Sequence, residues 1–159
     1  MANVTIYTDG AASGNPGRGG YGTILMSGVH RKELSGGYAY TTNNRMELMA
    51  VIAGLEALTQ AQCNVTVYSD SSYVVDAVEK KWVFEWEKKK FQKWKNADLW
   101  QRFLKSYRQH TVKFVWVKGH AGNPFNERCD KLAVAASAAP NLPDDVFYIE
   151  MQHDNDLFD

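Results

Sequence analysis

The chain contains few cysteines and few prolines, and it has no net charge. Its 159 residues include two cysteines and four prolines, and 18 Lys and Arg balance 18 Asp and Glu. Cys63 and Cys129 are far apart and lack the spacing of metal ligands, so we expect reduced thiols in a cytoplasmic protein. No segment resembles a signal peptide or a membrane span, and we expect no membrane partner. Zero net charge neither requires nor excludes a polyanionic ligand.

Charged residues are unevenly distributed along the chain, and hydrophobic residues make up 45% of it. That fraction suits one compact domain, which we expect to cover residues 1–143 and to be a monomer without an obligate protein partner. Residues 144–159 hold six acids and no Lys or Arg, and we expect them to form a flexible acidic tail. Residues 80–95 hold seven lysines among aromatic residues, which indicates an exposed basic projection.

Hydrophobic periodicity predicts an α/β fold with a five-stranded mixed sheet and helices on both faces. The first three strands are typical of an antiparallel meander, because short turns separate them. Helices separate the later strands, so right-handed crossovers are expected to make those strands parallel. The predicted strands are residues 4–8, 21–26, 31–40, 64–69 and 111–118, and the predicted helices include 45–58, 98–109 and 126–139.

A glycine-rich segment follows the first predicted strand and Asp9. We interpret residues 10–20 as a turn, in which missing Cβ atoms let a metal or a bulky polymer approach the backbone. Asp-Gly is also one of the commonest turn dipeptides. Turn formation alone therefore also explains Asp9.

Three further acids occupy settings comparable to that of Asp9. Glu47 and Asp130 each head an otherwise apolar stripe of a predicted helix. Asp70 ends a predicted strand parallel to the one that ends at Asp9, and it can also cap the next helix. Glu47 and Asp130 lie near helix N-termini, which favour anions in any case. Together the four acids supply oxygen ligands that suit Mg²⁺ or Mn²⁺ rather than zinc, and two such ions can clamp a scissile phosphate.

Several short blocks, in this order and spanning about residues 3–140, resemble bacterial type 1 ribonuclease H. They are Tyr-Thr-Asp-Gly at 7–10, Gly-Asn-Pro-Gly at 14–17, Thr-Thr-Asn-Asn-Arg-Met-Glu-Leu at 41–48, Ser-Asp-Ser at 69–71, Asn-Ala-Asp-Leu-Trp at 96–100, Trp-Val-Lys-Gly-His-Ala-Gly-Asn at 116–123 and Asn-Glu-Arg-Cys-Asp at 126–130. The resemblance implies the RNase H-like fold and an endonuclease that hydrolyses the RNA strand of RNA/DNA hybrids. It also implies two-metal-ion catalysis that leaves 5′-phosphate and 3′-hydroxyl ends.

The resemblance assigns roles to the acids and to one histidine. It implies that two Mg²⁺ ions, or Mn²⁺ in their place, are held by Asp9, Glu47, Asp70 and Asp130. The histidine that matches His120 is thought in such enzymes to aid proton transfer or product departure, which the near-neutral pKa of histidine permits. Simple solvent exposure in a glycine-rich loop is the alternative explanation for His120.

Hybrid recognition must distinguish the two strands, and the 2′-hydroxyl is the group that marks RNA. By resemblance, the side chains of Asn15, Asn43 and Asn44 line the minor groove of the hybrid. The resemblance also implies that the backbone at Gly10 lies close to RNA hydroxyls and that Thr42 contacts a phosphate of the DNA strand. Turn formation and helix capping explain the asparagines equally well.

The basic projection resembles the handle of the family, where lysines meet phosphates and tryptophans pack against sugars. A solvated amphipathic helix with a core-facing aromatic stripe is the alternative. The candidate residues are Trp82, Trp86, Lys88, Lys89, Lys90, Lys93 and Trp94. The handle is shorter than in the best-known bacterial members, and Tyr40 stands where some eukaryotic members place a phosphate-binding arginine.

Two other functions are open on the sequence. The first is a non-catalytic hybrid-binding module on the same fold, since a fold does not fix a function. The second is a DNA resolvase or integrase-like nuclease. The presence of all four acids favours an enzyme, and residues 42–44 together with the handle favour a hybrid substrate.

Overall fold

Alternating apolar residues form a five-stranded sheet with β1 at its centre. The computed structural model describes residues 1–119 and 122–158, with side chains described as far as His153. The strands are β1 (Asn3–Ser13), β2 (Gly17–Ser27), β3 (His30–Thr41), β4 (Asn64–Ser69) and β5 (Thr111–Trp116). They lie in the order β3-β2-β1-β4-β5, with antiparallel pairing from β3 to β1 and parallel pairing from β1 to β5. The predicted five-stranded mixed sheet is therefore confirmed.

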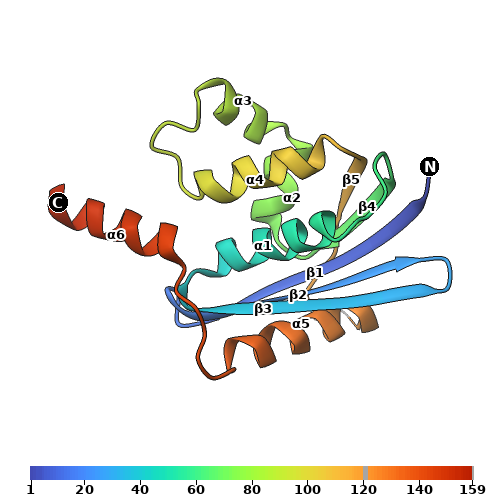
Figure 1. Ribbon diagram of the computed structural model, residues 1–159, viewed down its shortest axis with the longest axis horizontal. Coiled ribbons are helices and arrows are strands. Elements are labelled where there is room, and N and C mark those ends of the chain that lie inside the picture. The colour runs from blue at the N-terminus through green and yellow to red at the C-terminus, as the bar shows by residue number, and fades with distance from the viewer. Residues whose placement is uncertain (120–121, 159) are drawn as a thin grey trace.

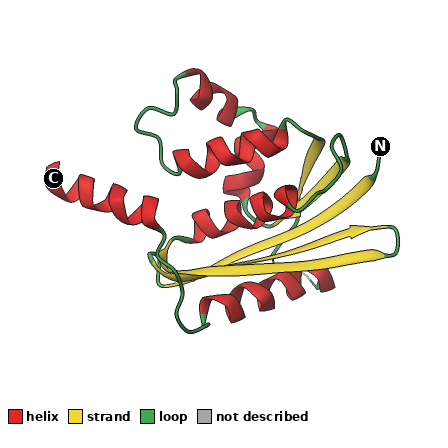
Figure 2. Cartoon of the chain, viewed as in Figure 1, coloured by secondary structure: helices red, strands yellow, loops and turns green. Residues whose placement is uncertain are grey.

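Helices cover both faces of the sheet (Figures 1 and 2). They are α1 (Asn43–Glu56), α2 (Ser72–Glu79), α3 (Trp82–Lys88), α4 (Ala97–Tyr107), α5 (Pro124–Ser137) and α6 (Val146–Phe158). In Figure 1, α1 and α4 lie on one side of the sheet and α5 lies on the other. The predicted placement of helices on both faces is also confirmed.

The main core lies between the sheet and α1, α2 and α4. Helix α1 begins after Thr42, whose hydroxyl accepts a hydrogen bond from the backbone N–H of Arg45. Ten of its residues are buried, so this helix packs against the sheet and α4 at once. The largest fully buried side chains of the core are Ile6, Ile24, Met46, Leu48, Ile52, Leu55, Trp100, Phe103 and Leu104.

The glycine-rich segment is mostly strand, which corrects the prediction of a turn over residues 10–20. Strand β1 continues to Ser13 and pairs with β2 as far as Arg18, so Asp9 lies within the strand and not at its end. The glycines serve close packing of α5 on β2. A Cβ at Gly22 would lie 2.4 Å from the carbonyl oxygen of Cys129, and one at Gly20 would lie 2.3 Å from that of Ala133.

The C-terminal residues form a helix that begins at a buried acid. Asp145 is 6% exposed, and α6 follows it and extends away from the sheet in Figure 1. The boundary at residue 143 and the flexibility of residues 144–159 stay predictions. Within residues 1–119 and 122–158, no helix is long and apolar enough to cross a membrane.

Candidate active site

The fold brings three of the four predicted acids together at one place. Asp9 comes from β1, Glu47 from α1, and Asp70 directly follows β4. Parallel pairing sets Thr8 opposite Ser69, so the next residues, Asp9 within β1 and Asp70 just after β4, lie side by side. One carboxylate oxygen from each of the three acids lies within 4.8 Å of the others. The sequence prediction of converging carboxylates holds for this triad.

Two acids of the triad are buried, which makes their negative charge costly. Asp9 and Glu47 are each only 5% exposed, and one oxygen of Glu47, Oε2, is buried without a hydrogen-bond partner. Burial, followed by the charge of Asp70, raises the pKa of Asp9 to about 8. Burial, followed by the charge of Asp9, raises the pKa of Glu47 well above its usual value. A bound cation would relieve both effects.

Two glycines allow the backbone to approach the acids closely. A Cβ at Gly10 would lie 2.4 Å from the backbone nitrogen of Glu47, so α1 can reach β1 only because that residue is glycine. The backbone N–H of Gly10 also donates a 2.9 Å hydrogen bond to Asp9. A Cβ at Gly119 would lie 2.9 Å from Oδ2 of Asp70. The chain after β5 therefore passes beside the acids.

The fourth predicted acid, Asp130, lies outside the compact triad. Asp130 lies in α5 and is partly buried, and its charge contributes to the raised pKa of Asp9. The packing of α5 on β1 and β2 fixes the position of Asp130. His120 lies outside the described residues.

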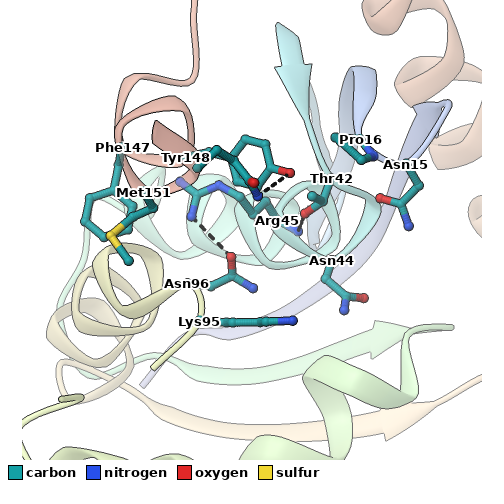
Figure 3. A pocket seen from close by; sticks show the side chains of 11 residues that line it. Asn15, Pro16, Thr42, Asn44, Arg45, Lys95, Asn96, Phe147, Tyr148 and Met151 are labelled. Atoms are coloured by element: carbon teal, nitrogen blue, oxygen red, sulfur yellow. Dashed lines mark hydrogen bonds between the residues drawn. The ribbon is translucent and has the colours of Figure 1, made fainter. Parts of the chain in front are cut away.

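The predicted amide contacts gather at the N-terminus of α1 (Figure 3). Oδ1 of Asn15 accepts a 3.1 Å hydrogen bond from the backbone N–H of Asn43, which ties the turn before β2 to the start of the helix. Asn15, Thr42 and Asn44 line a pocket of about 330 Å³. No acid lies in the first turn of α1, and its N-terminal residues Thr42 and Asn44 line the pocket, so the positive end of this helix lies at the pocket. The pocket suits an anionic group.

Some residues of the predicted handle line a cavity, and others are exposed outside it. Four of the candidate residues line a second cavity of about 590 Å³, and they are Trp82, Trp86, Lys93 and Trp94. The other lining residues are Ser72, Tyr73, Asp76 and Lys95. The rings of Trp86 and Trp94 lie 4.8 Å apart, and Trp86 also packs edge-on against buried Trp100. Lys88 pairs with Glu85 at 3.3 Å, and Lys89 and Lys90 are exposed outside this cavity.

A buried arginine next to the amide pocket was not assigned a role from the sequence. Arg45 is 2% exposed and donates two hydrogen bonds to Asp98, at 2.8 and 2.7 Å, and two to Asp145, at 2.7 and 3.0 Å. It also donates to Oδ1 of Asn96 at 3.3 Å. Burial lowers the pKa of Arg45, but the hydrogen bonds to the two acids outweigh it and raise the pKa above its usual value. An arginine next to a long apolar stretch of a predicted helix is the signal that could have indicated buried acidic partners.

Comparison with known proteins agrees with this geometry. The RNase H family model matches residues 1–138. The chain is 57% identical over 151 residues to a ribonuclease H of Desulforamulus reducens, covering 92% of this chain and 94% of that protein. It is 50% identical over 152 residues to a ribonuclease H of Pectobacterium carotovorum, covering 92% of this chain and 97% of that protein.

Solved structures of ribonucleases H have the same fold. LC9-RNase H1, described as a type 1 RNase H with the type 2 active-site motif, has a TM-score of 0.78 and 30% identity, covering 86% of this chain and 72% of that one. LC11-RNase H1, solved in complex with an RNA/DNA hybrid, has a TM-score of 0.58 and 27% identity, covering 84% of this chain and 95% of that one. With a family match that extends from residue 1 to residue 138 and relatives of similar length, the chain belongs to the RNase H family and is an enzyme.

Proposed function

We propose that this enzyme hydrolyses the RNA strand of RNA/DNA hybrids with two Mg²⁺ ions, for which Mn²⁺ can substitute, and leaves 5′-phosphate and 3′-hydroxyl ends. The observation that carries the proposal is the triad of Asp9, Glu47 and Asp70, whose oxygens lie within 4.8 Å of one another. The relatives named ribonuclease H, and the complex of LC11-RNase H1 with an RNA/DNA hybrid, support the choice of substrate.

The donor set fits a hard divalent cation. All three groups are carboxylates. Mg²⁺ and Mn²⁺ prefer carboxylate ligands, whereas zinc prefers histidine and cysteine. Glu47 Oε2 is buried without a partner, and Asp9 and Glu47 take part in none of the ion pairs of the described part of the chain. We assign Asp130 as the fourth ligand, because its charge already acts on Asp9. When bound, the ions supply activation of a water molecule and stabilisation of charge on the phosphate and the departing oxygen.

The balance of the reaction is simple. The oxygen of a water molecule forms a bond to phosphorus, the bond from phosphorus to the 3′-oxygen breaks, and that oxygen leaves with a proton as the 3′-hydroxyl. The water oxygen stays on the 5′-phosphate. We assign His120 to proton transfer or to product departure, because histidine is a common proton donor and acceptor in enzymes.

The residues around the triad orient the hybrid and exclude other nucleic acids. We assign Asn15, Asn43 and Asn44, with the backbone of Gly10, to the minor groove, where only the RNA strand carries 2′-hydroxyls. The N-terminus of α1 and its N-cap Thr42 suit a phosphate of the DNA strand, because helix N-termini attract anions. Recognition of this kind depends on strand chemistry and not on base sequence.

The handle extends the contact along the hybrid. We assign the aromatic cavity residues Trp82, Trp86 and Trp94 to deoxyribose packing and Lys93 to a phosphate. The exposed lysines outside the cavity, Lys88, Lys89 and Lys90, contribute phosphate attraction that salt screens.

Cleavage by the wild type and by Asp70→Asn tests the proposal. End-labelled RNA/DNA hybrid, duplex DNA, duplex RNA and branched DNA are offered in parallel with Mg²⁺ or with EDTA. We expect only the RNA of the hybrid to be cut, only with the metal, and Asp70→Asn to bind the hybrid without cutting it. Asp144→Asn is the matched control, because Asp144 is exposed and lies outside the triad. Hybrid binding without cutting by the wild type would indicate a non-catalytic module, and cutting of branched DNA would indicate a resolvase-like enzyme.

A further inference from the structure

One face of the C-terminal helix forms a wall of the pocket at the N-terminus of α1. The pocket of about 330 Å³ is lined on one side by Asn15, Thr42 and Asn44, and on the other by four residues of α6 (Figure 3). Those four are Phe147, Tyr148, Met151 and Gln152. Lys95 and Asn96 also line this pocket, so α6 shares one cavity with residues from three other parts of the chain.

The start of α6 is fixed by buried hydrogen bonds. Asp145 accepts from Nε of Arg45 and from the hydroxyl of Thr41, both at 2.7 Å, and its own backbone oxygen accepts from the N–H of Ile149. The backbone N–H of Ala39 donates a 2.9 Å hydrogen bond to the oxygen of Pro143, just before the helix. Since Arg45 belongs to the first turns of α1, the same network sets the distance between α6 and the amide residues.

The four α6 residues that line the pocket, which are those on this face with described side chains, carry no charge. Helix geometry places 147, 148, 151 and 152 on one stripe, because they are separated by three and four residues. Glu150 lies on the opposite side and is exposed. The ring of Tyr148 packs 5.8 Å from the ring of Tyr40, and its hydroxyl accepts a 2.9 Å hydrogen bond from Nε2 of Gln152. That bond uses an acceptor site of the hydroxyl, so the Tyr148 O–H can donate to a ligand.

The chemistry of this wall matches a sugar-phosphate backbone. Aromatic rings pack on deoxyribose, and hydroxyl and amide N–H groups donate to phosphate oxygens. The positive end of α1 lies at the same pocket, so a phosphate bound there would lie beside α6 and beside Lys95. We propose that Tyr148 and Gln152 of α6, with Tyr40, contact the DNA strand of the hybrid next to the phosphate held by Thr42. This inference rests on the proposed function, because it extends the same substrate site.

Binding and cleavage by surface variants of α6 test the inference. Gln152→Ala and Tyr148→Ala are compared with Glu150→Ala, which changes the opposite face of the same helix. We expect the first two to raise the Kd for the hybrid, measured in an Asp70→Asn background, by about three- to tenfold each, as for the loss of one or two hydrogen bonds. We expect Glu150→Ala to lower it or leave it unchanged. Tyr148→Phe, which keeps the ring pair with Tyr40, is expected to retain part of the affinity.

A chemical substitution in the DNA separates direct contact from an indirect effect. Single methylphosphonates, which remove the charge of one phosphate, are placed in turn along the DNA strand. We expect a methylphosphonate at one position to weaken binding of the hybrid by the wild type. At the same position it is expected to have a smaller effect on binding by Gln152→Ala. If every position affects both proteins equally, or if Gln152→Ala binds as the wild type does, the inference is wrong. Because Gln152 is exposed, its replacement leaves folding intact, which thermal unfolding verifies.

The outcomes distinguish this inference from the proposed function. If the wild type cuts hybrids and the α6 variants behave like the wild type, only the role of α6 is refuted. If the α6 variants bind the hybrid more tightly than the wild type, α6 obstructs the site and the inference is again refuted. If the wild type does not cut hybrids, the proposed function itself fails.

Discussion

Replacing Asp9 with asparagine is expected to stabilise the metal-free protein and to abolish its activity. Asp9 is 5% exposed, and burial with the charge of Asp70 raises its pKa from 3.8 to about 8. With this pKa, Asp9 of the metal-free protein takes up a proton on folding at pH 7. Each pKa unit corresponds to about 1.4 kcal/mol, and pH 7 lies roughly three units above the usual pKa, so this proton uptake costs the fold up to about 4 kcal/mol. Asparagine has nearly the same shape and no charge. We expect Asp9→Asn to raise the free energy of unfolding at pH 7 by about 2–4 kcal/mol.

The stability difference between Asp9→Asn and the wild type is expected to depend on pH. Because the pKa of Asp9 is higher in the folded than in the unfolded state, the stability contributed by its protonated form is full below about pH 4 and is lost as the pH rises through about 8. The advantage of Asp9→Asn over the wild type is therefore expected to be near zero at about pH 4 and to grow towards about pH 8. Mg²⁺ is expected to stabilise the wild type much more than the variant.

Urea unfolding in EDTA, followed by circular dichroism at several pH values, measures this difference. Asp144→Asn is the control, because the same substitution at an exposed acid is expected to change stability by less than about 0.5 kcal/mol. The reasoning is refuted if Asp9→Asn is no more stable than the wild type at pH 7 to 8, or if its advantage does not depend on pH.

Three further outcomes follow from the packing around the site. Gly10→Ala is expected to destabilise the protein by about 1–3 kcal/mol in thermal unfolding, since its Cβ would lie 2.4 Å from the backbone of Glu47; an unchanged Tm would contradict the close approach. Arg45→Ala is expected to lower the free energy of unfolding, measured with urea, by about 3–5 kcal/mol, because it leaves buried Asp145 without its cation. A decrease of less than about 1 kcal/mol would show that these ion pairs contribute little to stability. Burial raises the pKa of the Cys129 thiol to about 12, so iodoacetamide at about pH 8 is expected to modify Cys129 in urea and to leave it unmodified in the folded protein; rapid labelling of the native protein would argue against that burial.

The sequence predicted the sheet because its signals were local. Alternating apolar residues marked the strands, and the crossover rule predicted that β1 and β4 run parallel. Adjacent parallel strands would bring Asp9 and Asp70 to the same sheet edge, and the structure shows that the two strands are neighbours. The glycine-rich segment was misread as a turn because glycine is typical of turns. In the structure the same residues are strand, and their missing Cβ atoms admit α1 and α5 to the sheet.

The contacts of Arg45 could not be predicted from local patterns. Its partners Asp98 and Asp145 lie 53 and 100 residues away in the sequence, and no spacing rule connects them. The acidic composition of residues 144–159 favoured a flexible tail, which stays a prediction, and it gave no sign that Asp145 is buried against Arg45 or that a helix follows. The position of α6 at the amide pocket depends on this long-range pairing.

The central claim is that carboxylates from β1, α1 and the end of β4 hold divalent cations. A crystal of the wild-type protein soaked in Mn²⁺ tests it directly, because manganese is located by its anomalous scattering. We predict a peak at coordination distance, about 2.0–2.3 Å, from oxygens of Asp9, Glu47 and Asp70. A crystal with no peak there, or with a lysine or arginine side chain occupying the space between the three acids, would contradict the account.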